Sequence, residues 1–352
     1  MLELTKNRMR ILLKREVDES YDLVFGENLF PQIAKDLKQK PLGDRYAIVT
    51  DSNVKRLYAE SLKKILESEG LTAEIFSFEA GEHNKTMENC MKLMDKMSLL
   101  KYGRDVAILA LGGGVVGDIA GFIAAIFNRG VPYVQIPTTL LAQTDSSIGG
   151  KTAVDTDFGK NLIGAFNQPE KVYLDIATIT TLSDRDFISG LAETIKHGVI
   201  QDIDFFRYLS ENINLITARA PEFLLEIARN NCRIKGSIVE IDQHEKGLRR
   251  VLNYGHTIGH AIEKLSVDRY KRKESEVYLS HGEAVAIGMM VAGRISNSLG
   301  YFTQEELRKQ EQLLSAVGLP IKIPPEISNE AIIEVTSRDK KARDGKAQYV
   351  LP

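Results

Sequence analysis

Residues 106–118 read VAILALGGGVVGD, and this stretch indicates how the first half of the chain folds. Val106 to Leu111 is a short apolar run that suits a strand buried on both faces. Gly112, Gly114 and Gly117 then satisfy the G-x-G-x-x-G pattern, and the apolar segment that follows suits a helix. Strand, glycine turn and helix bring backbone amides close to a phosphate at a helix N-terminus. The motif alone is equally compatible with a tight turn that binds nothing.

The composition is that of an ordinary globular protein. The 352 residues suggest about two domains, and the net charge of −2 gives no indication of nucleic acid or an anionic membrane as a partner. Residues 106–127 are long enough to span a membrane, but Asp118 and five glycines argue against a span. Cys90 and Cys232 are not spaced as a metal pair, and the N-terminus lacks a signal-peptide pattern. We therefore expect a cytoplasmic protein with free thiols.

Strands and helices alternate through the first half, which predicts an α/β, Rossmann-like and mostly parallel sheet. The expected strands are 46–50, 73–78, 106–111 and 131–136, the expected helices are 30–37, 54–68 and 87–100, and 11–25 suits an opening hairpin or edge strands. Ligands bind at the carboxyl ends of such strands. Asp51, the loop 81–85, the glycine turn and Thr138 with Thr139 would all lie there, and this convergence favours a nucleotide site.

The pattern changes near residues 171–182, where we place a domain boundary. We expect a nucleotide-binding α/β domain at 1–175 and a mainly α-helical domain at 176–352. Helical periodicity covers 184–200, 221–241, 257–265, 283–299 and 305–317, and 349–351 suits a short strand.

Three histidines stand in two short motifs of the second half. His256 and His260 are four residues apart, so they share one helix face or flank a helix start, and His281 opens another helix. Glu193 lies in LAETIKHG, with Lys196 on the same face. Three His and carboxylate ligands with one open position form a catalytic zinc arrangement. A single histidine of this kind is more often a helix cap or a core residue, but the set favours a metal.

A second group is rich in cations and amides. It contains the loop Asp145–Lys151, Lys160 with Asn161, Lys235 and Arg249 around Glu245, and Asn253. A sugar phosphate that carries a carboxylate needs several donors of this kind. Most of the 46 lysines and arginines are instead solvated surface groups, so only those in glycine-rich loops support a binding role.

In these motifs the chain resembles the 3-dehydroquinate synthases, a family of shikimate-pathway enzymes that belongs to the sugar phosphate cyclases. The matching motifs include GGGVVGDIAGF, RGVPYVQIPTTLLAQTDSSIGGKTAV, GKNLIGAF, LAETIKHG, LNYGHTIGHAIE, HGEAVAIGM and RDKK, and they extend over nearly the whole chain. The resemblance implies a homodimer with NAD and Zn2+ (or Co2+) in a site between two domains. It also implies conversion of 3-deoxy-D-arabino-heptulosonate 7-phosphate to 3-dehydroquinate and phosphate, through transient oxidation, phosphate elimination, reduction and intramolecular aldol closure.

The resemblance also assigns residues. Glu193, His256 and His281 match the metal ligands, and the catalytic positions match Glu245, His260 and Lys151. The NAD contacts match Asp51, Asn53, Glu82, Lys85, Gly113, Gly114, Val115, Asp118, Thr138, Thr139, Lys160, Thr178 and Thr181. The substrate contacts match Arg129, which reaches the site of the partner subunit, Asp145, Lys151, Asn161, Lys196, the carboxylate clamp Lys235 and Arg249, Asn253, His260 and Lys340.

Two points depart from the family pattern or stay open. The charged stretch 264–280 is longer than we expect between the histidine motifs, and a solvated loop is favoured over a lid. In RDKKARDGK, spacing alone does not separate Lys340 from Lys341, and Lys340 is chosen. Alternative functions are another sugar phosphate cyclase, a metal-dependent polyol dehydrogenase or a nucleotide-binding sensor.

Overall fold

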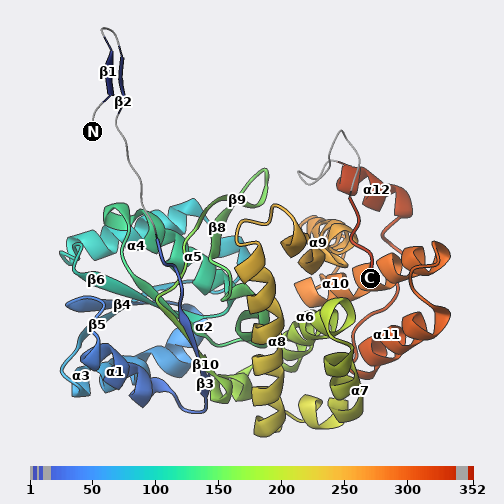
Figure 1. Cartoon of the computed structure of the whole chain (residues 1–352), viewed down its shortest axis with the longest axis horizontal. Helices are drawn as coiled ribbons and strands as arrows, with labels where there is room; N and C mark the ends of the chain where they lie inside the picture. The colour runs from blue at the N-terminus through green and yellow to red at the C-terminus, as the bar shows by residue number, and fades with distance from the viewer. Residues whose placement is uncertain (1–2, 6–7, 11–16, 338–347) are drawn as a thin grey trace.

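A six-stranded sheet organises the first half of the protein, as the computed structural model in Figure 1 shows. The structure describes residues 3–5, 8–10, 17–337 and 348–352. The strand order is β3-β10-β7-β6-β4-β5, and all neighbouring pairs are parallel, as expected. The strands are β3 (Asp22–Gly26), β4 (Arg45–Asp51), β5 (Thr72–Phe78), β6 (Val106–Gly112), β7 (Tyr133–Pro137) and β10 (Lys171–Asp175).

β6 lies inside the sheet, and every one of its residues is buried. Its alternating side chains enter two separate cores, because successive residues of a strand point to opposite faces. Val106, Ile108 and Ala110 pack under α4 (Met87–Leu99) and α5 (Gly114–Ile126). Ala107, Leu109 and Leu111 pack under α1 (Phe30–Gln39) and α3 (Glu60–Ser68). The apolar run in the sequence is thus a strand between two helical layers, and no described helix is long and apolar enough to cross a bilayer.

Some elements of the first half differ from the expectation. The helix expected at 54–68 is divided into α2 (Ser52–Val54), the π-helical η1 (Lys55–Ala59) and α3. The loop 81–85 contains a short 3₁₀ turn, η2 (Glu82–Asn84). Of the segment 11–25, residues 11–16 lie outside the described part, and β3 forms an edge strand. The N-terminal hairpin of β1 (Glu3–Thr5) and β2 (Arg8–Arg10) projects from the body in Figure 1.

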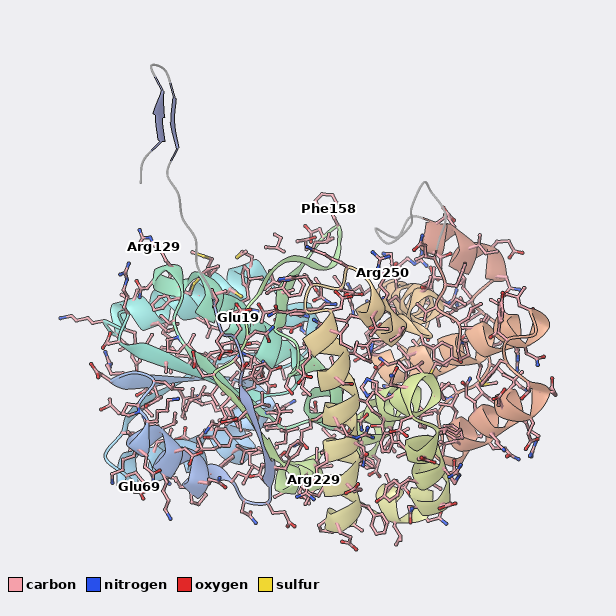
Figure 2. The ribbon with its side chains drawn as sticks, viewed as in Figure 1. Glu19, Glu69, Arg129, Phe158, Arg229 and Arg250 are labelled. Carbon is pink, nitrogen blue, oxygen red and sulfur yellow. The ribbon has the colours of Figure 1, made fainter. Side chains whose placement is uncertain are left out.

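The first half also contains an antiparallel hairpin that we did not expect and that is separate from the six-stranded sheet. It consists of β8 (Lys151–Thr156) and β9 (Gly159–Phe166), and residues 160–164 are exposed. Phe158 at its tip is 96% exposed and points away from the body in Figure 2. A strand with so little burial has no clean apolar alternation, which is why its sequence did not indicate a strand.

The second half is mainly helical, as expected. Its α-helices are α6 (Asp184–Gln201), α7 (Ile203–Thr217), α8 (Pro221–Ile241), α9 (His256–Lys271), α10 (His281–Ser298), α11 (Gln304–Ala316) and α12 (Asn329–Ser337). Shorter turns are η3 (Phe127–Arg129), η4 (Ala142–Ser146), η5 (Ile176–Thr181) and η6 (Leu248–Asn253). The sequence did not indicate α7 and α12.

Two predictions for the second half were wrong. The stretch 264–280 is not all loop, because α9 continues to Lys271 before the chain turns. Residues 349–351 form no strand, because helices rather than a sheet edge flank them. Thr257 of α9 donates to the carbonyl of Gln348 at 2.9 Å, and Ser296 of α10 donates to that of Pro352 at 3.1 Å.

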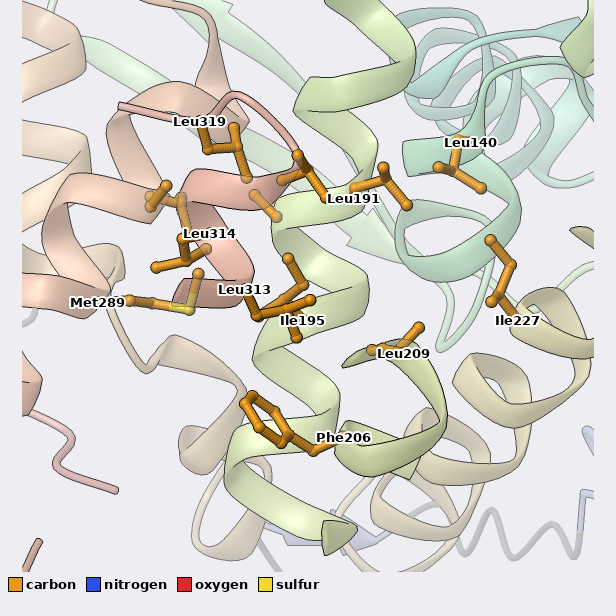
Figure 3. Packing of buried hydrophobic residues seen from close by; sticks show 14 of the residues in the cluster. Leu140, Leu191, Ile195, Phe206, Leu209, Ile227, Met289, Leu313, Leu314 and Leu319 are labelled. Carbon is orange, nitrogen blue, oxygen red and sulfur yellow. The ribbon is translucent and has the colours of Figure 1, made fainter. Parts of the chain in front are cut away.

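α6 passes through the largest hydrophobic cluster of the second half, shown in Figure 3. Leu191 and Ile195, one turn apart on α6, enter this cluster together with Leu209 of α7, Ile227 of α8 and Met289 of α10. Dense packing of this kind holds a helix in one position. Glu193, which lies between Leu191 and Ile195 on α6, is therefore held in a fixed position.

Candidate active site

The glycine turn forms an uncapped helix N-terminus at the carboxyl end of β6. Gly113 is the N-cap of α5 with an extended backbone, no side chain caps the helix, and its first turn carries no acidic residue. A Cβ on Gly112 would lie 2.5 Å from Cγ2 of Val116, so the turn closes only around glycine. Free amides and the partial positive charge of the helix end suit a phosphate group. Gly113, Gly114 and Val115, the expected cofactor contacts, are partly exposed there.

The polar residues that follow β4 and β5 lie along the same edge of the sheet. Asp51 caps α2, because its Oδ1 accepts from the amides of Asn53 at 2.8 Å and Val54 at 2.9 Å. Glu82 is exposed and lies 3.4 Å from the Nζ of Lys160 on β9. These carboxylates can receive the hydroxyls of a ribose, as the resemblance implies.

Lys85 joins the glycine-turn helix to the hairpin. Its ammonium group is paired with Asp118 of α5 and donates to Asn161 of β9 at 2.5 Å. Burial raises the pKa of Asp118 to about 6, although Lys85 favours the ionised carboxylate. Burial opposes the charge of Lys85, but Asp118 and neighbouring carboxylates outweigh it, and the pKa of Lys85 is raised. A ligand phosphate at this turn would meet a cation already held in place.

The four threonines expected to contact NAD differ in how much of the hydroxyl is available. Thr138 is buried, and its amide donates to the carbonyl of Gly112, whereas Thr139 is partly exposed beside Gly113. The buried Thr178 hydroxyl is used internally, since it donates to Asp175 at 2.7 Å and accepts from Gln143 at 3.2 Å. Thr181 is exposed and shares a 2.6 Å hydrogen bond with Tyr58. Thr139 and Thr181 are thus the better placed for a ligand.

Across from the turn, three helices bring Glu193, His256 and His281 together. Oε1 of Glu193 lies 3.4 Å from Nε2 of His256 and 3.6 Å from Nε2 of His281. The ligand atoms of His256, His260 and His281 also lie within 4.8 Å of one another. Glu193 is fully buried, and its Oε2 is paired with Lys196 one turn later. The sequence spacing alone did not show that α6, α9 and α10 meet at this point.

Glycines on α10 set how closely the three helices approach. A Cβ on Gly282 would overlap the carbonyl oxygen of Ser189, one turn before Glu193 on α6. A Cβ on Gly288 would overlap the carbonyl oxygen of Gly255, the residue before His256. The amide of Gly282 also donates to the hydroxyl of Ser189 at 3.0 Å. Small residues at both crossings therefore place His281 and His256 against Glu193.

The electrostatics of this group fit a divalent metal. Oε1 of Glu193 is buried and has no hydrogen-bond partner among the described residues, yet it faces both imidazoles. Burial lowers the pKa of His256 to about 3, so this ring is neutral and able to ligate. Burial also opposes charge on His281, but Glu193 and Glu263 outweigh it and raise its pKa to about 10, so these two carboxylates favour a positive charge at this position, which a metal ion would supply when bound. Two imidazole nitrogens and a carboxylate oxygen that lacks a hydrogen-bond partner form a ligand set that zinc prefers.

The expected substrate contacts form a neighbouring set. Lys151 is paired with Glu245, and Asn253 donates to the other oxygen of Glu245 at 2.7 Å. Glu245 has a positive φ of 55°, which is an uncommon conformation for a non-glycine residue and is typical of functional loops. Asp242, which lies between Lys235 and Arg249 in the sequence and had no predicted role, builds this loop. Its carboxylate accepts from the amides of Lys246, Gly247 and Arg249 at 2.8, 2.7 and 3.0 Å.

The two cations of the expected carboxylate clamp lie over the loop 145–149. Lys235 donates to the carbonyl of Asp145 at 2.8 Å and to its carboxylate at 2.6 Å. Arg249 donates to the carbonyl of Gly149 at 3.1 Å. Burial lowers the pKa of both Lys235 and Arg249, with Asp145 opposing the shift of Lys235. Buried cations of this kind strongly favour an anionic partner.

One loop contacts both parts of the site. A Cβ on Gly114 of the glycine turn would lie 3.0 Å from the hydroxyl oxygen of Ser146. Asp145, the preceding residue, has a carboxylate oxygen within 4.8 Å of ligand atoms of Glu193 and His197. The cofactor turn and the candidate metal ligands are therefore separated by one short loop.

The structure leaves the predictions for Arg129 and Lys340 untested, and it adds two residues to the site. Arg129 is exposed and lies at the outer edge of the sheet half in Figure 2, and Lys340 lies outside the described residues. The missed residues are Glu263, bonded to His281, and His197, buried with Nδ1 2.7 Å from Oδ1 of Asn231. Spacing places Glu263 on the same helix face as His260, three residues earlier, but its contacts with Lys160 and His281 depend on the fold.

Comparison with known families covers most of this chain. A family model described as 3-dehydroquinate synthase N-terminal matches residues 75–189, and one described as 3-dehydroquinate synthase C-terminal matches residues 190–342. The chain belongs to the 3-dehydroquinate synthase family. A relative named 3-dehydroquinate synthase, from Desulforamulus reducens, is 44% identical over 335 residues, which cover 95% of this chain and 91% of the relative.

Solved structures of related cyclases share the fold of this 3-dehydroquinate synthase family member. 2-epi-5-epi-valiolone synthase from Streptomyces hygroscopicus subsp. jinggangensis, with NAD+ and Zn2+ bound, superposes with a TM-score of 0.84 at 28% identity, covering 97% of this chain and 92% of that one. 2-deoxy-scyllo-inosose synthase in complex with carbaglucose-6-phosphate, NAD+ and Co2+ superposes with a TM-score of 0.81 at 28% identity. The match covers 91% of this chain and 86% of that one. The family is enzymatic, and it uses NAD and a divalent metal.

Proposed function

We propose that the protein converts 3-deoxy-D-arabino-heptulosonate 7-phosphate to 3-dehydroquinate and phosphate. Family membership supports this reaction, and one observation in the chain itself carries it. The loop 145–146 lies between the uncapped turn at Gly114 and the carboxylate of Glu193, so a substrate bound there would meet the cofactor and the metal together. Such proximity is what a reaction that combines redox and elimination steps requires.

The NAD residues would hold the cofactor along the carboxyl edge of the sheet. The pyrophosphate would lie on the amides of Gly113, Gly114 and Val115, with Lys85 beside them. When bound, NAD supplies a reversible hydride acceptor, and the metal supplies a Lewis acid for the substrate hydroxyls. Glu193, His256 and His281 would be the metal ligands.

The remaining residues would position the substrate and move protons. Lys235 and Arg249 would bind its carboxylate, and Lys151, Asn161, Lys196 and Asn253 would surround its phosphate. His260 lies with its ring centroid 5.2 Å from that of His256, close enough to exchange a proton with a substrate held by the metal. Glu245, paired with Lys151, is the second candidate for proton transfer.

The buried clamp favours this reaction over that of another cyclase. Lys235 and Arg249 are both buried, and among the described residues Lys235 pairs with Asp145, whereas Arg249 donates to backbone carbonyls and has Glu245 and Asp145 as nearby carboxylates. A substrate with a carboxylate completes this arrangement, whereas a sugar phosphate without one leaves it incomplete.

We also infer a homodimer, in which the exposed Arg129 reaches the site of the partner subunit. The single chain supports this because it keeps Arg129 away from its own cluster of candidate residues. The cytoplasmic location stays a prediction from the sequence. Sedimentation of the purified protein tests the dimer, and Arg129→Ala should lower turnover without loss of metal.

The test of the reaction is direct. The protein with NAD and Zn2+ is incubated with 3-deoxy-D-arabino-heptulosonate 7-phosphate, and released phosphate and 3-dehydroquinate are measured. Equal amounts of both, with no net NADH, are expected. Absence of phosphate release would refute the proposal, and steady accumulation of NADH would point to a polyol dehydrogenase.

A further inference from the structure

Glu263 on α9 is a buried carboxylate to which the proposed reaction gives no task. Glu263 is only 7% exposed. Its carboxylate lies between two basic groups from different parts of the chain. Oε2 lies 3.2 Å from Nδ1 of His281, and Oε1 accepts from Nζ of Lys160 at 2.7 Å. A buried carboxylate costs free energy unless it is paired, so these contacts hold it in this position.

The contact with Glu263 determines which nitrogen of His281 can bind a metal. An ionised carboxylate only accepts hydrogen bonds, so Nδ1 of His281 carries the proton that faces it. Nε2 is then the nitrogen that a bound metal would use, and it lies 3.6 Å from Oε1 of Glu193. Metal-binding histidines are commonly oriented in this way by a carboxylate or a carbonyl on the other nitrogen.

His256 is oriented by different means. Its Nδ1 lies 3.0 Å from the backbone carbonyl of Tyr254, two residues earlier. Tyr254 is itself fixed by its hydroxyl, which bonds Gln310 at 2.8 Å. The orientation of His256 thus depends on local backbone, whereas that of His281 depends on one side chain.

Lys160 gives that side chain an anchor in the other half of the protein. It belongs to the hairpin β8–β9, and its second partner is Glu82, 3.4 Å away at the sheet edge. Asp118, Glu82 and Asp155 are the other acids near this part of the hairpin, and Lys85 is already paired with Asp118. Among the described residues, Lys160 is therefore the cation that holds Oε1 of Glu263.

We infer that Glu263 is a positioning residue for the metal centre: it holds His281 with Nε2 toward Glu193, and Lys160 of the hairpin holds Glu263. This inference rests on the proposed metal ligands. Since Lys160 is also an expected NAD contact, the same carboxylate connects the cofactor side of the site to the metal side.

The test measures metal binding and not only turnover. Apo protein is titrated with Zn2+ against a competing chelator, and the Co2+ form is examined by visible absorption, which reports ligand geometry. Glu263→Gln, which keeps the shape of the side chain and removes its charge, should weaken Zn2+ binding about 10- to 100-fold and change the Co2+ spectrum. The matched control is Asp268→Asn, which removes one acid from the exposed end of the same helix, where it pairs with Lys264. This control should change Zn2+ affinity less than about twofold.

Lys160→Met separates the two contacts, because it keeps Glu263 but removes its anchor. It should weaken Zn2+ binding less than Glu263→Gln does, and it decides the matter if Glu263→Gln does not fold. Unchanged Zn2+ affinity and an unchanged Co2+ spectrum in the folded variants would overturn the inference while leaving the metal site intact. A parent protein that binds no stoichiometric Zn2+ would overturn the metal site and this inference together.

Discussion

The two halves of the protein build their parts of the site in different ways. The sheet half offers backbone groups at strand ends, chiefly the amides of the turn at Gly113 and Gly114, and these follow directly from the parallel topology. The helical half offers side chains from α6, α9 and α10, whose relative positions follow from helix packing. A site made from one turn tolerates local change, whereas a site shared by three helices depends on every crossing. We expect the helical half to be the more sensitive to small substitutions.

The largest effect is expected from Gly282→Ala. The added Cβ meets a backbone oxygen of Ser189, which cannot rotate away, so α10 must move from α6 and take His281 with it. We expect Zn2+ content and turnover to fall more than about a hundredfold, and the free energy of unfolding to fall by about 1–3 kcal/mol. Metal analysis and urea unfolding measure both. The control is Gly236→Ala on α8, where a Cβ meets nothing within 4 Å and helix propensity should raise stability by up to about 1 kcal/mol.

The next effect separates the metal from the cofactor. His256→Ala should remove bound metal and lower turnover about a hundredfold, or about 2.7 kcal/mol, because a Lewis acid stabilises the transition state. NAD affinity, measured by calorimetry, should stay close to that of the parent protein, because NAD lies on the sheet half. His260→Ala should keep its metal and slow turnover. Loss of zinc from the His260 variant instead would show that the pair of histidines is assigned the wrong way round.

A smaller effect is expected from Gly114→Ala in the sheet half. Its Cβ would lie 3.0 Å from the hydroxyl oxygen of Ser146, a side-chain atom that can move. NAD affinity should fall about tenfold, or about 1.4 kcal/mol, while Zn2+ affinity stays unchanged. A loss of zinc as large as that of Gly282→Ala would contradict the contrast between the halves.

The smallest effect compares the two thiols, one in each half. Burial raises the pKa of both Cys90 and Cys232 to about 12. At pH 8 both are therefore protonated, and neither should react with a thiol reagent in the folded, metal-loaded protein. Removal of zinc should speed the reaction of Cys232 in the helical half and leave that of Cys90 unchanged. Equal exposure of both thiols would mean that the halves loosen together.

The sequence predicted the strands whose burial produces a run of apolar residues. β4, β5, β6 and β7 are apolar runs between helices, and each was expected within a few residues of its bounds. The hairpin β8–β9 was missed because its second strand is exposed, and β10 because it begins where the boundary was placed. Tertiary contacts rather than local pattern decide such segments.

The candidate site divides in the same way. Residue types and motifs indicated Glu193, His256 and His281, but neither their convergence nor the glycine crossings behind it could be obtained from spacing along one chain. Glu263 was missed because its partners, Lys160 and His281, are 103 and 18 residues away in sequence. The role of a buried carboxylate can be inferred only when the side chains that the fold places around it are known.

The loop that carries Asp145 and Ser146 has a mechanical consequence. The two residues are adjacent, so the contact with the glycine turn and the contact with Lys235 are separated by one peptide unit, about 3.8 Å between Cα atoms. A rotation of α8 relative to α5 would therefore have to break one of the two contacts or move the loop between them. This short loop thus couples α5 of the sheet half to α8 of the helical half.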